Sequence, residues 1–330
     1  MKSTVNGLAI AAALLLLAAL PAAAQQSGKM YRIGYLNPNP GPSVSTPPFR
    51  TPVFIKRLSD LGWIEGQNIT LEYRFGERDE AKLRNGALEL VRLRVDVIVA
   101  ISSSSLRAAR TATATIPIIA IDLETDPVAS GLAQSISRPD KNVTGLFLDL
   151  PELNGKRLQL LREVVPGLTR VAVLWDPSLD PAPLKAAEVA GRTANILIQP
   201  APVRRPADFN QALRGATAQR AGAIMVIQSP MLDMHDRDIA DLAVQRRLPS
   251  IALFRRFTES GGLMSYGPDL NALFTQAADY VDRILKGAKP GSLPIERPAR
   301  FELVINRNTA KTLSLTIPPS LLLRADEIID

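Results

Sequence analysis

The sequence predicts an α/β protein built from two doubly wound lobes. Short apolar runs alternate with amphipathic stretches along the chain, which is typical of parallel sheets covered by helices on both faces. The alternation restarts after residue 148, so the pattern has two halves with about five strands each. The length of 330 residues also favours two domains over one.

Strands in the first half are predicted where apolar residues run together or alternate, and helices where they recur every three or four positions. Gly62 marks the end of the first helix, because glycine often follows helices directly. The expected strands are YRIGYL (31–36), ITLEYRF (69–75), VDVIVAI (95–101), IPIIAID (116–122) and VTGLFL (143–148), and the expected helices are 54–62, 81–94 and 105–114.

The second half follows the same rules, with Asp208 expected to cap one helix. The expected strands are TRVAVLW (169–175), ILIQPAPV (196–203), GAIMVIQ (222–228), LPSIALF (248–254), GLMSYG (262–267) and FELVIN (301–306), and the expected helices are 152–165, 182–194, 208–220, 234–247, 269–286 and a short one after residue 306.

Residues 1–24 are expected to form a cleavable signal peptide that exports the protein to the periplasm. Lys2 precedes an apolar run, Leu8–Leu20, which ends in Pro21 and three alanines. The run is shorter than the roughly 20 residues of a membrane-spanning helix. The chain has no cysteine, so we expect no disulfides, no thiolate chemistry and no lipid anchor on an N-terminal cysteine.

The excess of positive charge gives no sign of a nucleic-acid partner. Lys and Arg number 39 against 32 Asp and Glu, a formal charge of +7. The basic residues are scattered in pairs at most, whereas nucleic-acid binders gather them on one face or in an arm. We read the charge as a contribution to solubility.

Polar residues follow two of the predicted buried strands of the first half. Ser102, Ser103, Ser104 and Ser105 stand between a strand and a helix, where one serine could cap the helix. Four in a row leave spare hydroxyls beside the N–H groups of a helix N-terminus, which bind anions. Helix capping and the binding of a ligand carboxylate are both consistent with this stretch.

Acidic residues follow the next strand. Asp122 and Glu124 are candidates to hold a ligand ammonium or hydroxyl group, and Asp126 before Pro127 is typical of a helix N-cap. Two carboxylates could also perform general acid–base chemistry, but the sequence offers no partner base.

The sequence carries no strong catalytic or metal-binding motif. His235 is the single histidine, and the four aspartates around it are more typical of an acidic first helical turn than of a metal site. Nucleophile-elbow, zinc-protease and phosphate-loop motifs are absent. We therefore expect no enzyme activity, no metal and no cofactor.

Trp175, Phe254 and Tyr266 end, or nearly end, strands in the second half. They could stack on an apolar part of a ligand or pack in the core, and the sequence favours neither.

Several long blocks resemble the bacterial ABC-transporter substrate-binding family that includes the tryptophan-binding TrpX-type proteins. They are LSDLGWIEGQNITLEYRFGE, ELVRLRVDVIVAISSSSLRAARTATATIPIIAI, DPVASGLAQSISRPDKNVTGL, GKRLQLLREVVPGLTRVAVLW, GGLMSYGPDL and the stretch from KPGSLPIERP to the C-terminus. The resemblance implies a type I periplasmic-binding fold, which has two Rossmann-like lobes, a three-strand hinge and a small polar ligand enclosed between them. It also implies a monomer that delivers an amino acid or related carboxylate to membrane permease subunits.

In that fold the N-terminal lobe is expected to comprise residues 28–147 and 267–297, and the C-terminal lobe residues 148–266 and 298–330. The family's ligand-contacting loops correspond here to two groups of residues, Asn37, Ser102, Ser103, Ser104, Asp122, Glu124 and Thr125 in the first lobe, and Trp175, Asp176, Gln228, Phe254 and Tyr266 in the second. The loops after residues 37 and 122 depart from the family pattern, so the resemblance does not fix the ligand.

Two other functions fit the same features. The protein could be a ligand-sensing subunit for a membrane receptor, which uses the same fold without transport. It could also be a periplasmic hydrolase, in which case changing Asp122 or Glu124 should abolish turnover.

Overall fold

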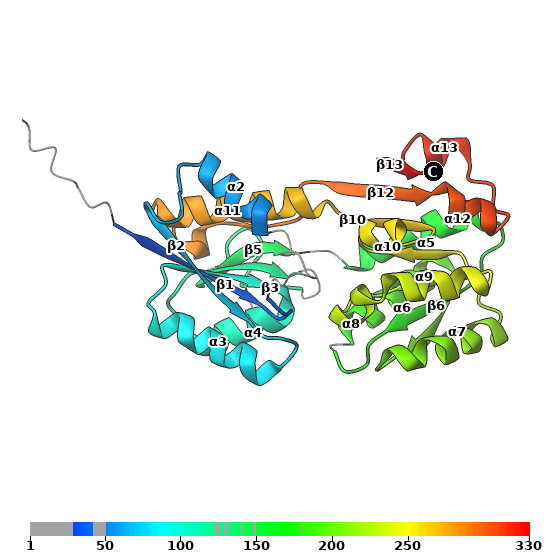
Figure 1. Ribbon diagram of the computed structural model, residues 1–330, viewed down its shortest axis with the longest axis horizontal. Helices are drawn as coiled ribbons and strands as arrows, with labels where there is room; N and C mark the ends of the chain where they lie inside the picture. The colour runs from blue at the N-terminus through cyan, green and yellow to red at the C-terminus, as the bar shows by residue number, and fades with distance from the viewer. Residues whose placement is uncertain are drawn as a thin grey trace, which may run out of the picture.

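The strands of the protein form two sheets. The computed structural model describes residues 29–41, 51–122, 126–128, 131, 133–139, 141–147, 150–179 and 181–330. Within these ranges, one sheet has six strands and the other seven. Figure 1 shows the two sheets, each with its own helices, side by side along the long axis. We call them the first and second lobe, in the order in which the chain enters them.

The first-lobe sheet is parallel between all its paired neighbours, in the order β11-β5-β4-β3-β1-β2. Its central strands are buried on both faces, which explains their continuous apolar sequences. The strands are β1 (Tyr31–Asn37), β2 (Ile69–Phe75), β3 (Val97–Ile101), β4 (Ile118–Asp122), β5 (Val143–Phe147) and β11 (Ile295–Glu296).

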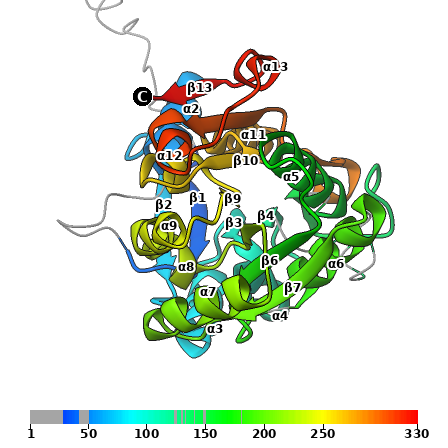
Figure 2. The same cartoon turned by 90° about the vertical axis from the view of Figure 1, so that its right-hand side faces the viewer.

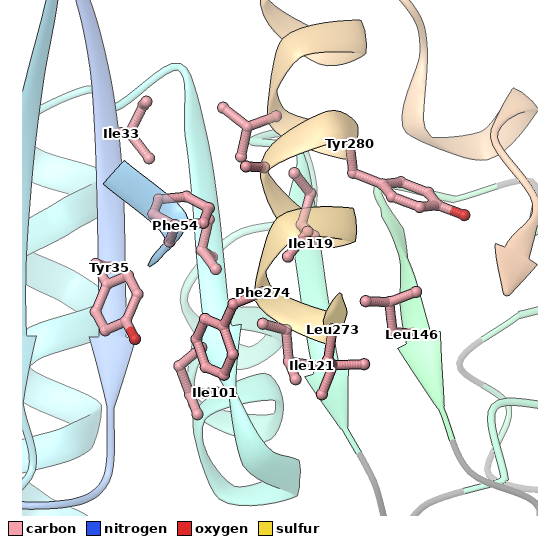
Figure 3. Close-up of a cluster of buried hydrophobic side chains, with 14 of the residues drawn as sticks. Ile33, Tyr35, Phe54, Ile101, Ile119, Ile121, Leu146, Leu273, Phe274 and Tyr280 are labelled. Atoms are coloured by element: carbon pink, nitrogen blue, oxygen red, sulfur yellow. The ribbon is translucent and has the colours of Figure 1, made fainter. Parts of the chain in front are cut away.

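Helices cover both faces of this sheet (Figure 1). On one face, Tyr35, Phe54 and Phe274 belong to a core that joins the strands to α2 and α11, and Figure 3 shows part of it. The second core joins the opposite face to α3 and α4. The helices are α2 (Thr51–Asp60), α3 (Glu80–Arg92), α4 (Ser102–Ala112) and α11 (Leu270–Leu285).

The second-lobe sheet has the order β13-β12-β10-β9-β8-β6-β7. Its strands pair in parallel except for β10 and β12, which are antiparallel. The strands are β6 (Arg170–Trp175), β7 (Leu197–Pro202), β8 (Ala223–Val226), β9 (Ser250–Ala252), β10 (Met264–Pro268), β12 (Phe301–Asn306) and β13 (Glu327–Ile329).

Two separate cores hold the second lobe together. One packs α5 and α6 against the sheet, and the other packs α7, α9 and α10 against its opposite face. Figure 2 shows α5 and α6 on one side of the second-lobe strands and α7 and α9 on the other. The helices are α5 (Leu150–Val164), α6 (Ala182–Ala194), α7 (Phe209–Ala218), α8 (Pro230–Met234), α9 (Asp236–Gln245), α10 (Arg255–Glu259), α12 (Arg307–Thr312) and α13 (Pro319–Leu322), with short 3₁₀ turns η1 (Pro206–Asp208) and η2 (Pro290–Ser292).

The chain passes between the lobes after β5, after β10 and after β11. Side-chain contacts stabilise the segments that join the two lobes. Tyr266 of β10 stacks on Phe301 of β12 with ring centroids 6.0 Å apart, and the Tyr280 hydroxyl donates to the Pro294 carbonyl at 2.7 Å. This arrangement agrees with the three-strand hinge that the family resemblance implies.

The predicted fold class is confirmed, and several predicted elements differ in detail. The helix expected over 234–247 is α9, which runs from Asp236 to Gln245, and the short helix α8 that precedes it was not predicted. Asp208 precedes α7 but does not cap it, since its carboxylate accepts from the backbone N–H groups of Arg204 and Arg205. Asp126 accepts from the Val128 N–H in a turn and does not begin a helix.

Candidate functional site

The carboxyl ends of β1, β3 and β4 lie side by side at one edge of the first-lobe sheet. Leu36 pairs with Ala100, and Ile101 pairs with Ile121, so the residues that follow these positions are neighbours. The fold therefore brings the predicted positions Asn37, Ser102–Ser104 and Asp122 to one edge, which is where ligands bind in open α/β sheets.

Asn37 is buried and its side chain already has a partner. It is 2% exposed, and its Oδ1 accepts from the backbone N–H of Asn39 at 3.0 Å. The Asn37 carbonyl accepts from Gly76 at 2.8 Å. Asn37 therefore fixes the loop after β1, and its amide NH₂ group is the part of the side chain suited to a ligand.

The serines lie inside the first turn of α4, whereas the sequence predicted that this helix begins at residue 105. The residue at the N-cap position is Ile101, which provides no side-chain cap. Serine capping at that position, which the sequence left open, is therefore not found. The Ser102 and Ser104 hydroxyls bond each other at 2.9 Å.

Ser102 has a φ of +76°, in the left-handed region that side chains other than glycine rarely adopt. Such strain costs about 1–3 kcal/mol and collects at functional sites. It turns the chain sharply out of β3, so that the helix N-terminus and its positive dipole end lie at the sheet edge. This geometry is suited to an anion.

The structure describes only part of the acidic loop after β4. Asp122 is the last residue of the strand and pairs in register with Phe147. Glu124 and Thr125 lie outside the described residues.

Three of the second-lobe candidates lie at the ends of β6 and β8. Trp175 ends β6, Asp176 follows it, and Gln228 comes two residues after β8. Because Leu174 pairs with Val226, Trp175 and Gln228 belong to neighbouring strand ends. The Asp176 carboxylate accepts from the N–H of Ser178 at 2.9 Å and from its hydroxyl at 2.6 Å, so it is engaged in a local turn.

Two polar atoms at these strand ends lack a hydrogen-bond partner. Trp175 Nε1 and Gln228 Oε1 are both buried and unpaired. Buried polar atoms are nearly always hydrogen-bonded in folded proteins, and each exception calls for an explanation. One is a donor and the other an acceptor, so a polar molecule bound here could satisfy both.

Phe254 and Tyr266 lie near the passages between the lobes. Phe254 immediately precedes α10, and Tyr266 is in the middle of β10. Both are partly buried against the core of the first lobe. Burial raises the pKa of the Tyr266 phenol, which keeps it neutral. Their positions fit packing beside the hinge at least as well as ligand stacking.

Sequence reasoning missed two polar residues of α5, Asn154 and Arg157. They are 1% and 3% exposed. Burial lowers the pKa of the Arg157 guanidinium to about 10, and the group stays positively charged at neutral pH. The sequence spacing could have revealed that Arg157 is buried, because it falls four residues from both Leu153 and Leu161 on the buried stripe of the helix.

The described residues hold no group of three or more acidic or histidine side chains that could bind a metal ion. His235 bonds Asp238 through Nδ1 at 2.8 Å and packs edge-on against Phe209. Within the same residues, no helix is both long enough and apolar enough to span a bilayer.

Comparison with known proteins identifies the family. The family model described as ABC transporter substrate binding protein matches residues 51–329. The chain is 27% identical over 269 residues to the tyrosine-binding protein of Clostridioides difficile, which covers 79% of this chain and 75% of that protein.

Solved structures agree with this fold. A conserved domain protein from Vibrio cholerae superposes with a TM-score of 0.80 at 26% identity, over 91% of this chain and all 100% of that chain. The ABC domain from Streptococcus pneumoniae in complex with L-Trp superposes with a TM-score of 0.77 at 22% identity, over 91% and 100% of the two chains. The two Rossmann-like lobes have the type I periplasmic-binding fold. The chain belongs to the ABC transporter substrate-binding protein family.

Proposed function

We propose that this protein is the solute-binding subunit of an ABC importer, and that it captures an amino acid or related carboxylate between its two lobes. The observation that carries the proposal is the family match over residues 51–329, on a fold whose two sheets each place polar groups at the carboxyl ends of their strands. The tyrosine-binding relative and the neighbour in complex with L-Trp support an amino acid as the ligand class.

The lobes would act as a hinged clamp. We assign residues 28–147 and 267–297 to one lobe and residues 148–266 and 298–330 to the other. Closure about the passages near Tyr266 and Phe301 would bring the edge of β3 and α4 toward the edge of β6 and β8. Permease subunits would recognise the outer rims of the closed form. We further propose that residues 1–24 export the protein to the periplasm and that it acts there as a monomer.

In this proposal the N-terminus of α4 receives the ligand carboxylate. Its support is that Ile101 provides no side-chain cap for the helix, that Ser102 is strained, and that Ser103 and Ser104 lie in the first turn. Asp122 or Glu124 would meet the ligand ammonium, with Thr125 beside them. From the second lobe, Trp175, Asp176 and Gln228 would complete the site, and Phe254 and Tyr266 would close its hinge side.

The first test is native mass spectrometry of the mature protein as purified from cells, followed by a thermal-shift screen of amino acids, small carboxylates and nucleosides. At a ligand concentration of 100 times Kd, binding stabilises the fold by about 2.7 kcal/mol. We expect one amino acid to co-purify, or to raise Tm in a concentration-dependent way. An empty protein that no compound stabilises, but that consumes one of them, would refute the proposal in favour of a hydrolase.

The second test uses intrinsic fluorescence, because the chain has two tryptophans. Trp63 lies in the first lobe, where its indole Nε1 donates to the Asp282 carboxylate at 2.8 Å. It is not one of the proposed ligand contacts. We expect Trp63→Phe to retain a ligand-dependent change in emission and Trp175→Phe to lose it. A signal that follows Trp63 instead would exclude Trp175 from the site.

A third test addresses the α4 contact. Ser103→Phe should weaken binding about tenfold or more, since hydrogen bonds to a charged group contribute roughly 1.5–3 kcal/mol. Thr111→Phe, on an exposed turn of the same helix, is the matched control. Unchanged affinity in the Ser103 variant would remove α4 from the site.

A further inference from the structure

Arg157 is a buried cation without a counter-ion among the described residues. It is 3% exposed, and burial is the only effect that shifts its pKa, with no charged partner among the described residues. Nη1 donates to the Val226 carbonyl at 3.5 Å and Nη2 donates to Asn154 Oδ1. Nε has no hydrogen-bond partner. A guanidinium offers five N–H donors, so most of its hydrogen-bonding capacity is unused.

A charge in this position is costly to the folded protein. Removing an ion from water destabilises the folded protein unless a partner of opposite charge and good hydrogen bonds compensate for it. An arginine cannot avoid this cost by losing its proton, because its pKa stays far above neutral. Two neutral acceptors do not neutralise the charge, so the site is complete only with an anion.

The location of the guanidinium links it to the proposed ligand site. Val226, whose carbonyl it contacts, is the last residue of β8 and lies two positions before Gln228. The neighbouring strand end carries Trp175. The second-lobe edge therefore gathers three buried unpaired atoms, which are the donors Arg157 Nε and Trp175 Nε1 and the acceptor Gln228 Oε1.

We propose that Arg157 receives the carboxylate of the bound amino acid from the second lobe, opposite the N-terminus of α4 in the first. This inference rests on the proposed function and deepens it. One anionic group is then held from both lobes, and lobe closure depends on the presence of that group. The site consequently selects ligands with a free carboxylate against their amides and esters. Trp175 Nε1 adds a second donor, and Gln228 Oε1 accepts from the ligand ammonium.

The test is a double-mutant cycle between protein and ligand. Isothermal titration calorimetry measures Kd for L-tyrosine, L-tryptophan and L-leucine and for their primary amides. Amidation removes the anionic charge while it keeps the size of the group. In the wild-type protein we expect the amide of the best-bound amino acid to bind about 10- to 100-fold more weakly than the acid. In Arg157→Met, this preference should shrink about tenfold or more, to the part that the α4 N-terminus still provides.

Two further variants separate a ligand contact from a structural role. Arg157→Lys keeps the charge and should restore part of the preference for the acid. Arg162 is an exposed arginine five residues further along α5, and Arg162→Met should leave both affinities unchanged. If Arg157→Met does not fold in a thermal-unfolding assay, Arg157→Gln takes its place, because its side-chain amide can still meet the Asn154 side chain.

Each contrary result has a distinct meaning. If the preference for the acid is as large in Arg157→Met as in the wild type, whether or not both ligands bind more weakly, the inference is overturned and Arg157 is left as a support for β8. In that case the proposed function would stand, since the wild-type protein binds the acid. If the wild-type protein binds none of these three amino acids and no amino acid or carboxylate of the thermal-shift screen, the proposed function fails first and the inference falls with it.

Discussion

Replacing Gly145 with alanine should destabilise the first lobe more than the same change at other glycines. Gly145 lies in β5, the last strand before the chain first leaves that lobe. Its φ is +136°, and a Cβ built there would lie 2.1 Å from the Ala120 carbonyl oxygen and 2.6 Å from the Ala120 nitrogen. Both neighbours are backbone atoms of β4, the strand with which β5 pairs, so neither can move aside without breaking the sheet.

The expected loss of folding stability in Gly145→Ala has two contributions. A positive φ costs a residue with a Cβ about 1–2 kcal/mol, and forcing extra volume into a packed region costs typically about 1–3 kcal/mol. Together they amount to about 2–5 kcal/mol, a large share of the roughly 5–15 kcal/mol by which a typical protein is stable. A domain of this size loses about 2–4 °C of Tm per kcal/mol, so Tm should fall by about 4–20 °C.

Two other glycines separate these contributions. Gly62 has a φ of +90° with nothing within 4 Å of a built Cβ, so Gly62→Ala carries the backbone cost alone. Gly267 has an ordinary φ, but its Cβ would lie 2.1 Å from the Leu253 carbonyl oxygen, so Gly267→Ala carries the steric cost alone. Thermal and urea unfolding of the three variants should rank Gly145→Ala as the most damaging. A loss for Gly145→Ala no larger than that for Gly62→Ala would refute the steric argument.

Three further predictions concern single side chains. Asp269 accepts from the backbone N–H groups of Asn271 and Ala272 at the start of α11, so Asp269→Ala should cost about 1 kcal/mol in urea unfolding while Asp269→Asn costs little, and equal losses would contradict the capping role. Burial raises the pKa of Tyr73 to about 12, so the neutral phenol stabilises the fold below the ordinary pKa of 10.0 and that contribution is lost as the pH rises toward 12. When tyrosine ionisation is followed by absorbance up to pH 12, Tyr73→Phe should remove the part of the absorbance change that appears at the highest pH. An unaltered titration curve would contradict the raised pKa of Tyr73. The backbone N–H of Arg204 and the side chain of Arg205 lower the pKa of Asp208, so its carboxylate stabilises the fold above pH 3.8 and this contribution disappears as the pH falls below that value. The difference in unfolding free energy between wild type and Asp208→Asn should therefore shrink in acid, and a constant difference would exclude the carboxylate as its source.

The strong local patterns predicted the helices and strands well. The strand ITLEYRF and the helix over 182–194 are found with the predicted bounds, because each has a clear apolar period and a clear stop signal. The short strand β11 was missed. It has two residues in a proline-rich stretch, and it is a strand only because Ile295 pairs with Gly145 far away in the chain.

The candidate site was also predicted in part. Sequence reasoning found the positions at the strand ends, since the polar residues there interrupt obvious apolar runs. It could not find that Ser102 adopts a positive φ or that α4 begins at that residue, because these follow from how β3 joins a packed helix. The roles of Asn37, Gln228 and the other proposed ligand contacts remain predictions for the binding experiments.

By itself, the sequence determined the α/β class, the two-lobed organisation and the family resemblance, because these depend on hydrophobic period and on residue order along the chain. Only the tertiary structure decided which polar groups lack partners. Arg157 appears in the sequence as one more basic residue of a helix, and its significance comes from what surrounds it. A charge is costly or useful according to its distance from water and from other charges, and those distances exist only after residues remote in sequence have packed together.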